Sequence, residues 1–318
     1  MKKVNIILST YNGEKYLPIQ MDSLLNQSYP NITIYIRDDG SSDGTLRIIK
    51  EYQRQQGNKK IILLEDNEGN LGYVKSFMKI IRNCDPADYY AFCDQDDYWL
   101  SDKIERAVQH LSSLESDKCL LYTSAYAVCD SKLNVIDSGH EPMPLEELSV
   151  GKSLSLYDGG WLLGFTCVIN DELRIKAFNN EITDMYSHDI WVQAVAVAMK
   201  GIQVYDKKVT AYFRRHENTT SVAETGMAKS VLDAWKYRWN ETFGNGKMFE
   251  RLKSGVVSFH SAFMQDVTQE EDILFLKLFV GDKGKLIKRI KKVFYPYRLK
   301  KGFFVEIAWR FAILLGKI

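Results

Sequence analysis

The chain has 318 residues, of which 45% are hydrophobic and 26% charged, and its 42 Lys and Arg balance 41 Asp and Glu to a formal net charge of +1. These values are ordinary for a globular protein and exclude a disordered, collagen-like or low-complexity chain. The length allows one large domain or about two. Because the net charge is near zero, we expect no nucleic-acid partner.

The first hundred residues predict strands that alternate with helices. Apolar runs predict the strands, and apolar residues at helical spacing predict the helices. In chain order the expected elements are a strand at 4–9, a helix at 14–28, a strand at 32–36, a helix from 46 that stops by 57, a strand at 61–64, a helix at 74–81 and a strand at 89–93. This alternation is typical of βαβ units, which build a parallel sheet with right-handed crossovers.

Polar clusters follow the strands at the points where they end. They lie at residues 9–12, 38–45, 67–72 and 94–97. Because ligands of open parallel sheets bind at the carboxyl ends of the strands, the four clusters together predict a ligand site at that edge.

The rest of the chain predicts a mixed region and then a helical one. Between 118 and 213 we expect strands at 120–128 and 165–169, a helix at 185–199, a loop-rich segment at 130–160 and a hairpin-like pair at 203–205 and 209–213. After about residue 225 we expect helices at 228–243, 248–264 and 270–280. We find no internal repeats.

The cysteines and apolar runs indicate a compartment. Five scattered cysteines without a CxxC pair argue against a disulfide framework or a zinc site and favour a reducing cytosol. The apolar run at 4–8 is too short for an export signal, and no stretch approaches the roughly 18–20 apolar residues of a spanning helix. We therefore expect a cytoplasmic protein that is not integral to a membrane.

Two acidic segments are candidates for binding a nucleotide and a metal. In DDGSSDGT (38–45), carboxylates can accept hydrogen bonds from a nucleobase or ribose, and helix N-terminal amides can hold phosphate; the alternative is a turn capped by Ser42 or Asp43. In DQDD (94–97), Asp94 and Asp96 can face one point. A divalent ion such as Mg²⁺ or Mn²⁺ that bridges to a diphosphate would relieve their repulsion; the alternative is a solvated acidic loop.

Two further segments could carry catalysis and charge neutralisation. In HDIW (188–191), Asp189 is either a helix cap or a general base for a hydroxyl. In FRRH (213–216), the arginines and histidine at a strand end could neutralise a diphosphate or supply a metal ligand, and the alternative is a basic turn at the surface.

Taken in order, these segments resemble family 2 glycosyltransferases of the GT-A fold over most of residues 3–220. The matching segments are IILSTYNG (6–13), QSYPNITIYIRDDGSSDGT (27–45), NEGNLG (67–72), DQDD (94–97), WLLGFTCVIN (161–170) and HD (188–189). The last of these, with YFRRHEN (212–218), is similar to bacterial rhamnosyltransferases that build cell-wall or capsular polysaccharide. The resemblance implies an α/β catalytic domain over 1–220, a mainly parallel Rossmann-like sheet flanked by helices, and a helical C-terminal region over 221–318.

The resemblance also implies roles for individual residues. Those expected to bind the donor nucleotide are Thr10, Tyr11, Asn12, Asp38, Asp39, Asn67, Gly72, Asp94 and Gln95. The expected ligands of Mn²⁺ or Mg²⁺ are Asp96 and Asp94 of the DxD motif, with His216. Those expected near the diphosphate or acceptor are Asp97, Trp161, His188, Arg214 and Arg215. Asp189 matches the catalytic base, which in the family usually follows a Glu that His188 replaces here.

The implied reaction is a single displacement that inverts the anomeric carbon, with no covalent intermediate. The expected donor is dTDP-rhamnose, and the alternative is UDP-glucose, UDP-galactose or UDP-GlcNAc. The expected acceptor is a polyprenyl-diphosphate-linked saccharide. The chain lacks the QxxRW motif of processive members, so we expect transfer of one or a few sugars.

Two other classes of protein fit the sequence less well. A nucleotidyltransferase would need a Gly-rich, basic phosphate loop near the first strand, and residues 8–15 lack one. A non-catalytic sugar-binding module would not need Asp94, Asp96 and Asp189 together.

The C-terminal segment combines positive charge with apolar residues. Residues 283–301 hold nine Lys and Arg and no acid, and 303–318 are rich in aromatic and aliphatic residues. This composition suits an interfacial helix on an anionic leaflet, so we expect a peripheral protein on the inner face of the cell membrane; the alternative is a helix packed on the catalytic domain. The helical region at 225–280 could serve a homodimer.

Overall fold

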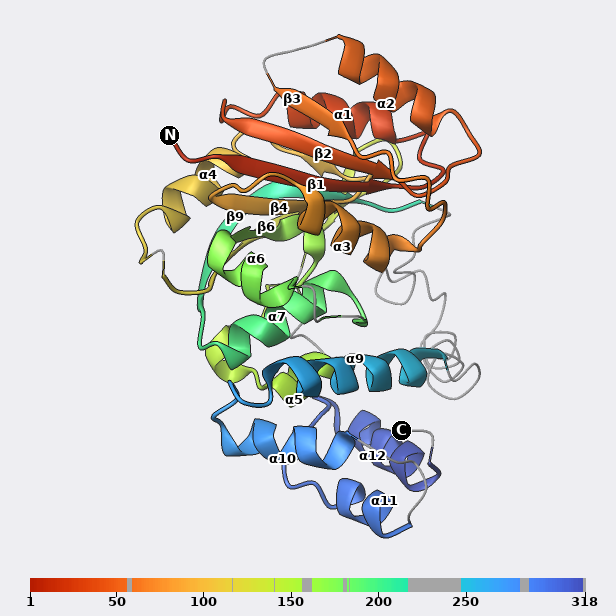
Figure 1. Ribbon diagram of the computed structural model, residues 1–318, viewed down its shortest axis with the longest axis vertical. Coiled ribbons are helices and arrows are strands. Elements are labelled where there is room, and N and C mark those ends of the chain that lie inside the picture. The colour runs from red at the N-terminus through yellow and green to blue at the C-terminus, as the bar shows by residue number, and fades with distance from the viewer. Residues whose placement is uncertain are drawn as a thin grey trace.

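The computed structural model describes residues 1–55, 59–115, 117–139, 141–155, 162–179, 182, 184–216, 247–280 and 286–316. A sheet with helices on both faces occupies one end of the molecule, and further helices extend to the other end, where the C-terminus lies (Figure 1). This is the α/β architecture with a helical C-terminal region that the sequence predicts. The helix expected at 228–243 lies outside the described residues.

The described strands form one sheet in the order β3-β2-β1-β4-β8-β6-β9-β5, with β7 paired to β6. β1 to β4 are parallel to one another, whereas β8 is antiparallel to β4 and β6. The strands are β1 (Val4–Thr10), β2 (Ile32–Asp38), β3 (Lys60–Leu63), β4 (Tyr89–Cys93), β5 (Tyr98–Trp99), β6 (Leu120–Cys129), β7 (Val135–Ser138), β8 (Cys167–Asn170) and β9 (Ile202–Arg214).

The helices between the first strands cover both faces of the sheet, which explains why β1 is apolar at successive positions. Ile6 and Leu8 pack in the cluster under α1 (Leu17–Leu25) and α2 (Thr45–Arg54), whereas Ile7 packs in the cluster under α3 (Tyr73–Asn83). All three side chains are fully buried. Burying each of these side chains stabilises the fold by about 1.5–3 kcal/mol. This packing on both faces holds β1 in place and so fixes where its carboxyl end lies.

The hairpin expected at 203–205 and 209–213 is wrong, because this segment is the single strand β9. β9 runs parallel to β6, and its register shifts where Ser124 pairs with Asp206 and Ala125 pairs with Val209. Lys207 and Lys208 therefore form a bulge instead of a turn. The Asp206 carboxylate pairs with Arg106 at 2.7 Å. Aspartate is common in turns, but here it anchors the strand.

Several short elements depart from the sequence prediction. The strand expected at 165–169 begins at Cys167, because residues 164–166 form a 3₁₀ turn. The segment expected to be loop-rich contains β7 and α5 (Val150–Leu154). The sequence prediction also lacks β5, α4 (Lys103–Leu111) and α6 (Asp171–Ala177).

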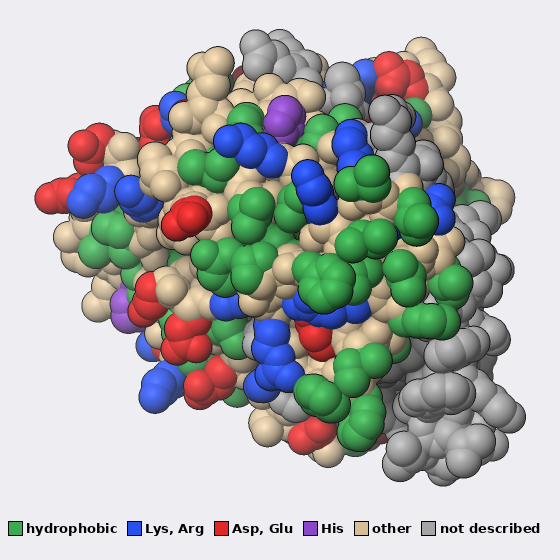
Figure 2. Space-filling view, turned by 90° about the horizontal axis from the view of Figure 1, so that it is seen from below, with side chains coloured by type: hydrophobic (Ala, Val, Ile, Leu, Met, Phe, Trp, Pro, Cys, Tyr) green, Lys and Arg blue, Asp and Glu red, His purple; other side chains and the backbone are tan. Residues whose placement is uncertain are grey.

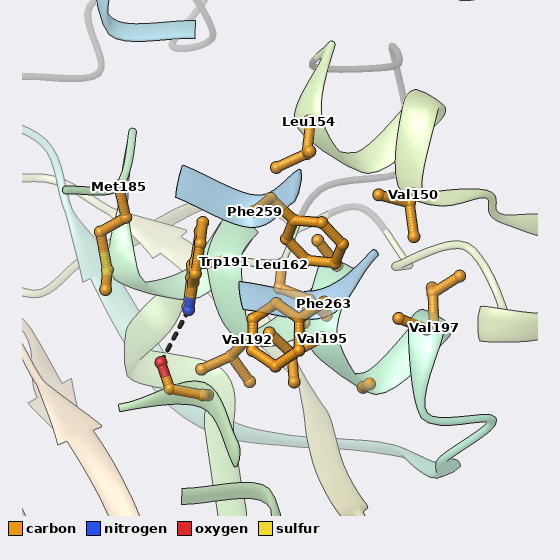
Figure 3. Close-up of a cluster of buried hydrophobic side chains, with 14 of the residues drawn as sticks. Val150, Leu154, Leu162, Met185, Trp191, Val192, Val195, Val197, Phe259 and Phe263 are labelled. Carbon is orange, nitrogen blue, oxygen red and sulfur yellow. Dashed lines mark hydrogen bonds between the residues drawn. The ribbon is translucent and has the colours of Figure 1, made fainter. Parts of the chain in front are cut away.

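The helices beyond the sheet share its core. Trp191 of α7 (His188–Ala198) packs against Phe259 and Phe263 of α9 (Lys247–Phe263), with ring centroids 5.4 and 6.0 Å away. Its indole Nε1 donates to the Ala177 carbonyl at 2.7 Å, as the dashed line in Figure 3 shows. Buried residues of α10 (Glu270–Phe279) and α12 (Phe303–Leu314) belong to the same cluster. The sheet and the C-terminal helices are thus joined by continuous apolar packing, and the domain boundary at residue 220 stays a prediction.

Candidate active site

The carboxyl ends of β1, β2 and β4 bring three of the predicted polar clusters together. The Thr10 hydroxyl donates to Asp38 Oδ1 at 3.0 Å. The side chain of Gln95 bonds both backbone groups of Tyr11, accepting from its N–H and donating to its carbonyl, each at 2.9 Å. Gln95 therefore fixes the loop after β4 to the loop after β1, and this role uses both ends of its amide.

The loop after β2 is a turn that presents the Asp38 carboxylate. Asp38 accepts from the Ser41 N–H at 2.9 Å and from the Ser41 hydroxyl at 2.6 Å. Asn12, whose φ of 47° is in the left-handed region that Asn tolerates, accepts from the Ser42 N–H at 2.8 Å. Asp43 accepts from the Thr45 N–H at 3.0 Å. The N-cap residue of α2 is Gly44 and it makes no side-chain cap bond, so the capping alternative is wrong and Asp43 only shapes the turn. Asp38 remains half-buried and Tyr11 exposed.

Asp39 is buried and holds the loop before α3. It accepts from the N–H groups of Leu71 and Gly72 at 2.7 and 2.8 Å and pairs with Arg37. Both oxygens are thereby occupied and the residue is 2% exposed, so in this structure Asp39 holds the loop before α3, and its predicted contact with the nucleotide stays a prediction. Asn67, another residue that the sequence predicts to bind the nucleotide, is exposed on that loop.

Arg37 is a central residue of this edge that the sequence prediction missed. Its side chain is 1% exposed and forms two hydrogen bonds to Asp66, at 2.7 and 3.2 Å, besides its pair with Asp39. It also donates to the Gly69 carbonyl at 2.9 Å. One guanidinium thus ties the end of β2 to the loop that reaches Gly72, a geometry that suits the planar fork of arginine.

Carboxylates crowd together after β4. Burial, followed by the nearby charges of Asp96 and Asp189, raises the pKa of Asp94 to about 7. Burial, with Asp96 and Asp94 nearby, also raises the pKa of Asp97 well above its ordinary value. Asp97 is 1% exposed, and its Oδ1 accepts from the Arg214 N–H at 3.2 Å. Charges of one sign that raise each other's pKa call for a cation.

Asp96 and His216 are the residues best placed for that cation. Asp96 Oδ2 lies 2.8 Å from His216 Nε2. In the described part of the chain, no three His, Cys, Asp or Glu side chains form a complete metal site. Mg²⁺ in phosphate-handling sites is usually held by one or two carboxylates together with substrate phosphates, and Mn²⁺ likewise prefers carboxylate ligands. The carboxylates therefore fit a divalent ion whose remaining ligands a phosphate-bearing substrate would supply.

Tyr16, which the sequence prediction also missed, organises the basic side chains after β9. Its ring centroid is 4.5 Å from that of His216 and 4.8 Å from the guanidinium carbon of Arg214. Arg214 is 1% exposed. Arg215 is half-buried, and its N–H donates to the Cys129 carbonyl at 2.9 Å. The stacking holds His216 toward Asp96.

Asp189 lies in the first turn of α7, at the same site. Its effect on the pKa of Asp94 places its charge near that carboxylate. The N-cap residue of α7 is Ser187, whose hydroxyl donates to Asp189 Oδ1, and the Ile190 N–H donates to the same oxygen at 2.8 Å. Asp189 is half-buried and is not the cap residue, so it fits a general base better than the capping alternative.

His188 departs from the sequence prediction of an acceptor contact. Its ring stacks on Phe77 with centroids 4.1 Å apart and lies 4.8 Å from Phe92. It is 4% exposed, and burial lowers its pKa. The absence of Cβ in Gly164 makes room for it, because a Cβ there would be 2.5 Å from His188 Nε2. His188 is therefore a neutral packing residue. Trp161 lies outside the described residues.

Comparisons with known proteins agree with this geometry. Residues 5–130 match the family model described as glycosyl transferase family 2. The dTDP-rhamnosyl transferase RfbG of Shigella flexneri is 30% identical over 66% of this chain and 72% of its own. The UDP-Glc:alpha-D-GlcNAc-diphosphoundecaprenol beta-1,3-glucosyltransferase WfaP of Escherichia coli is 28% identical over 70% of this chain and 80% of its own.

Two solved structures share the fold. S. aureus TarS 1–349 in complex with UDP-GlcNAc is 16% identical, with a TM-score of 0.54 over 98% of this chain and 89% of its own. The mannosyltransferase PcManGT of Pyrobaculum calidifontis in complex with GDP-Man and Mn²⁺ is 14% identical, with a TM-score of 0.50 over 99% of this chain and 86% of its own.

Proposed function

The chain belongs to glycosyltransferase family 2, and we propose that it is a metal-dependent, inverting enzyme that moves one sugar from a nucleotide-sugar donor to an acceptor hydroxyl. The observation that carries the proposal is the crowding of Asp96 and Asp189 around the buried Asp94, with His216 in contact with Asp96. A sugar-binding module has no need of such crowding, which costs free energy until a cation binds.

The donor nucleotide is proposed to bind where the loops after β1 and β2 meet. Asp38 and the exposed Tyr11 flank this edge. A half-buried carboxylate can accept hydrogen bonds from a base or ribose, and a tyrosine ring can stack on the base. Asp39 and Arg37 support this proposal indirectly, because they hold the neighbouring loop in place.

The diphosphate is proposed to lie between the basic side chains after β9 and the acidic ones after β4. Asp96 and His216 would hold Mn²⁺ or Mg²⁺, whose chemistry when bound is to stabilise negative charge on the diphosphate. The Mn²⁺ named with the fold neighbour PcManGT supports this choice. Arg215 is half-buried, whereas Arg214 is fully buried, so Arg215 is the arginine available to bind the diphosphate.

Asp189 is proposed to act as the general base. Its carboxylate takes the proton of the acceptor hydroxyl as that oxygen forms a bond to the anomeric carbon of the donor sugar. The bond from that carbon to the diphosphate oxygen breaks in the same step, and the nucleoside diphosphate leaves with the electron pair. Attack from the face opposite the leaving group inverts the anomeric centre. Ser187 orients Asp189 by donating to its Oδ1 atom.

The proposed donor is dTDP-rhamnose, because RfbG is named a dTDP-rhamnosyl transferase. UDP-glucose is the second candidate, because the name of WfaP specifies UDP-Glc. That name also specifies a saccharide on diphosphoundecaprenol, which supports a polyprenyl-diphosphate-linked acceptor in surface polysaccharide synthesis. Such an acceptor places the enzyme at the inner face of the cell membrane. A homodimer stays a prediction.

A donor panel tests this function. The full chain is incubated with Mn²⁺ and dTDP-rhamnose, UDP-glucose, UDP-galactose or UDP-GlcNAc in turn, and the released nucleoside diphosphate is measured. We expect release from one donor, and we expect the Asp96→Asn variant to release none above background. Equal release by the two proteins, or no release from any donor with or without a lipid-linked acceptor, would contradict the proposal.

A further inference from the structure

Helix α12 is apolar on two opposite faces. One stripe faces the core, and its buried members are Glu306, Trp309, Ala312 and Ile313. The other stripe has the same helical spacing and faces away from the core; its exposed members are Phe304, Ile307, Phe311 and Leu314. Phe304 is 83% exposed. A helix that is apolar all round is normally buried on every side, so the outer stripe of α12 lacks the cover that its composition calls for.

The neighbouring helix α11 (Leu286–Val293) extends the same surface. Ile287, Ile290 and Phe294 recur at helical spacing and are exposed, Ile287 at 68% and Phe294 at 77%. We call these residues, together with the outer stripe of α12, the terminal apolar face; the two helices that carry it pack against each other. Figure 2 looks at this end of the molecule and shows hydrophobic side chains gathered with Lys and Arg between them. In the part of the chain that the structure describes, no helix is long and apolar enough to span a membrane.

The exposed charges on α11, on α12 and on the segment between them are positive. Lys288, Lys291, Arg298 and Lys301 are exposed there. The sequence from 283 to 318 holds one acid, Glu306, which is 6% exposed and pairs with Arg310 at 2.7 Å. The exposed side chains of α11 and α12 therefore carry no negative charge.

Two of the nine basic residues of the 283–301 stretch do not contribute to this surface. Lys300 turns inward, where its Nζ donates to the Ser155 carbonyl at 2.5 Å and lies 4.4 Å from the Trp309 ring centroid. Lys292 is 5% exposed and lies over the Phe279 ring. These inward lysines fix the two helices on the core, whereas the exposed lysines and arginine named above face solvent. The packing alternative from the sequence thus applies to one face of α12, and the membrane expectation concerns the other face and stays a prediction.

We propose that the terminal apolar face docks on the surface of an anionic lipid bilayer, with its phenylalanines and isoleucines at the level of the acyl chains and its lysines and arginines among the headgroups. Aromatic and aliphatic residues beside Lys and Arg are what such an interface selects. A second copy of the chain fits less well, because it would bring the same positive charges against each other with no exposed acid on α11 or α12 to pair with them.

Lipid binding at this face rests on the proposed function only in the choice of an anionic leaflet. The test uses co-sedimentation of the full chain with vesicles and no sugar donor, so it can fail while sugar transfer stands, and the donor panel can fail while lipid binding stands. The vesicles contain either phosphatidylcholine alone or phosphatidylcholine with phosphatidylglycerol. We expect the protein to sediment with the anionic vesicles and to remain largely in the supernatant with the neutral ones.

Two variants separate the apolar and the charged contributions. The triple variant Phe294→Ser, Phe304→Ser and Phe311→Ser should bind anionic vesicles at least about tenfold more weakly, because it removes the side chains that would be buried. Its control is Val135→Ser with Ile136→Ser, which changes exposed apolar residues of β7. The variant Lys288→Gln with Lys291→Gln should bind about 25-fold more weakly, since each charge near an anionic surface contributes about fivefold. Its control is Lys132→Gln with Lys207→Gln, two exposed lysines elsewhere.

Each outcome either supports or overturns the proposal. Loss of binding in both variants and wild-type binding in both controls supports the docking face. Equal binding to neutral and anionic vesicles, or wild-type binding by the phenylalanine variant, overturns it. A dimer that the phenylalanine variant dissociates in sedimentation equilibrium, without vesicle binding by the wild type, also overturns it in favour of a second copy.

Discussion

Asp96 Oδ2 and His216 Nε2 lie 2.8 Å apart although 120 residues separate them in the sequence. The contact forms because β9 ends beside the loop that follows β4, and Tyr16 stacks on the imidazole from α1's side of the sheet. These residues come from two separate segments, DQDD and FRRH, which the family resemblance assigns to one metal site, and the fold brings the two side chains into contact.

The Asp96–His216 pair predicts metal-dependent nucleotide binding. The Asp96→Asn variant should bind the nucleoside diphosphate equally with and without Mn²⁺, and His216→Ala should lose about tenfold or more of the affinity measured with Mn²⁺. Isothermal titration with and without Mn²⁺ measures both. His110→Ala is the control, because this exposed histidine also lies beside a carboxylate, Asp206, but does not belong to the Asp96–His216 pair. Wild-type affinity with Mn²⁺ in either variant would show that the pair does not hold the ion.

Asp189→Asn should separate chemistry from binding. The amide keeps the shape of the side chain but cannot take a proton at neutral pH, so kcat should fall by about 10² to 10⁴ while the dissociation constant of the donor stays unchanged. Ser187→Ala should lower kcat less, because it removes only the hydroxyl that orients the Asp189 carboxylate. Pre-steady-state transfer rates and equilibrium donor binding test these claims. A loss of donor affinity that matches the loss of rate would assign Asp189 to binding instead.

Much of the fold follows from local patterns in the sequence. The first four strands and three helices are found where apolar periodicity predicts them, because each element buries a stripe or both faces against its neighbours in the chain. The error at β9 has a long-range cause: Asp206 looks like a turn residue until Arg106 pairs with it. The missed helix α6 did leave a local signal, since Asn170 caps it by accepting from the Leu173 N–H and two acids follow in its first turn.

The sequence predicts many of the residues at the candidate site but not what each of them contacts. Sequence motifs assign both Asp38 and Asp39 to the nucleotide, whereas in the structure Asp38 is half-buried and Asp39 is buried with backbone N–H groups on both oxygens. Arg37 and Tyr16 were missed because an arginine inside an apolar strand and a tyrosine before a helix carry no motif of their own. Their importance comes from partners about thirty to two hundred residues away, which only the folded chain brings within reach.

Arg37→Met should destabilise the protein more than its single position suggests. The substitution leaves the Asp39 carboxylate buried without its cation, which costs about 3–5 kcal/mol of the free energy of unfolding. Urea denaturation measures it. The control is Arg47→Met, which removes an exposed pair with Glu51 and should change the free energy of unfolding little, because water screens such pairs. Adding Asp39→Asn to Arg37→Met should cost less than the sum of the two single changes; strict additivity would mean that the two groups do not stabilise each other.

Asp206 should make stability depend on acid pH. Burial alone would raise its pKa, but hydrogen bonds from Arg106, the Lys208 N–H and Tyr122 outweigh burial and lower the pKa to about 2, from an ordinary value of 3.8. Since the folded pKa is the lower one, the stabilisation is present above pH 4 and is lost as pH falls through 4 toward 2. The difference in unfolding free energy between wild type and Asp206→Asn should therefore shrink by about 1 kcal/mol between pH 6 and pH 3. Urea denaturation at the two pH values measures that difference, and a constant gap would show that Asp206 does not titrate in this range.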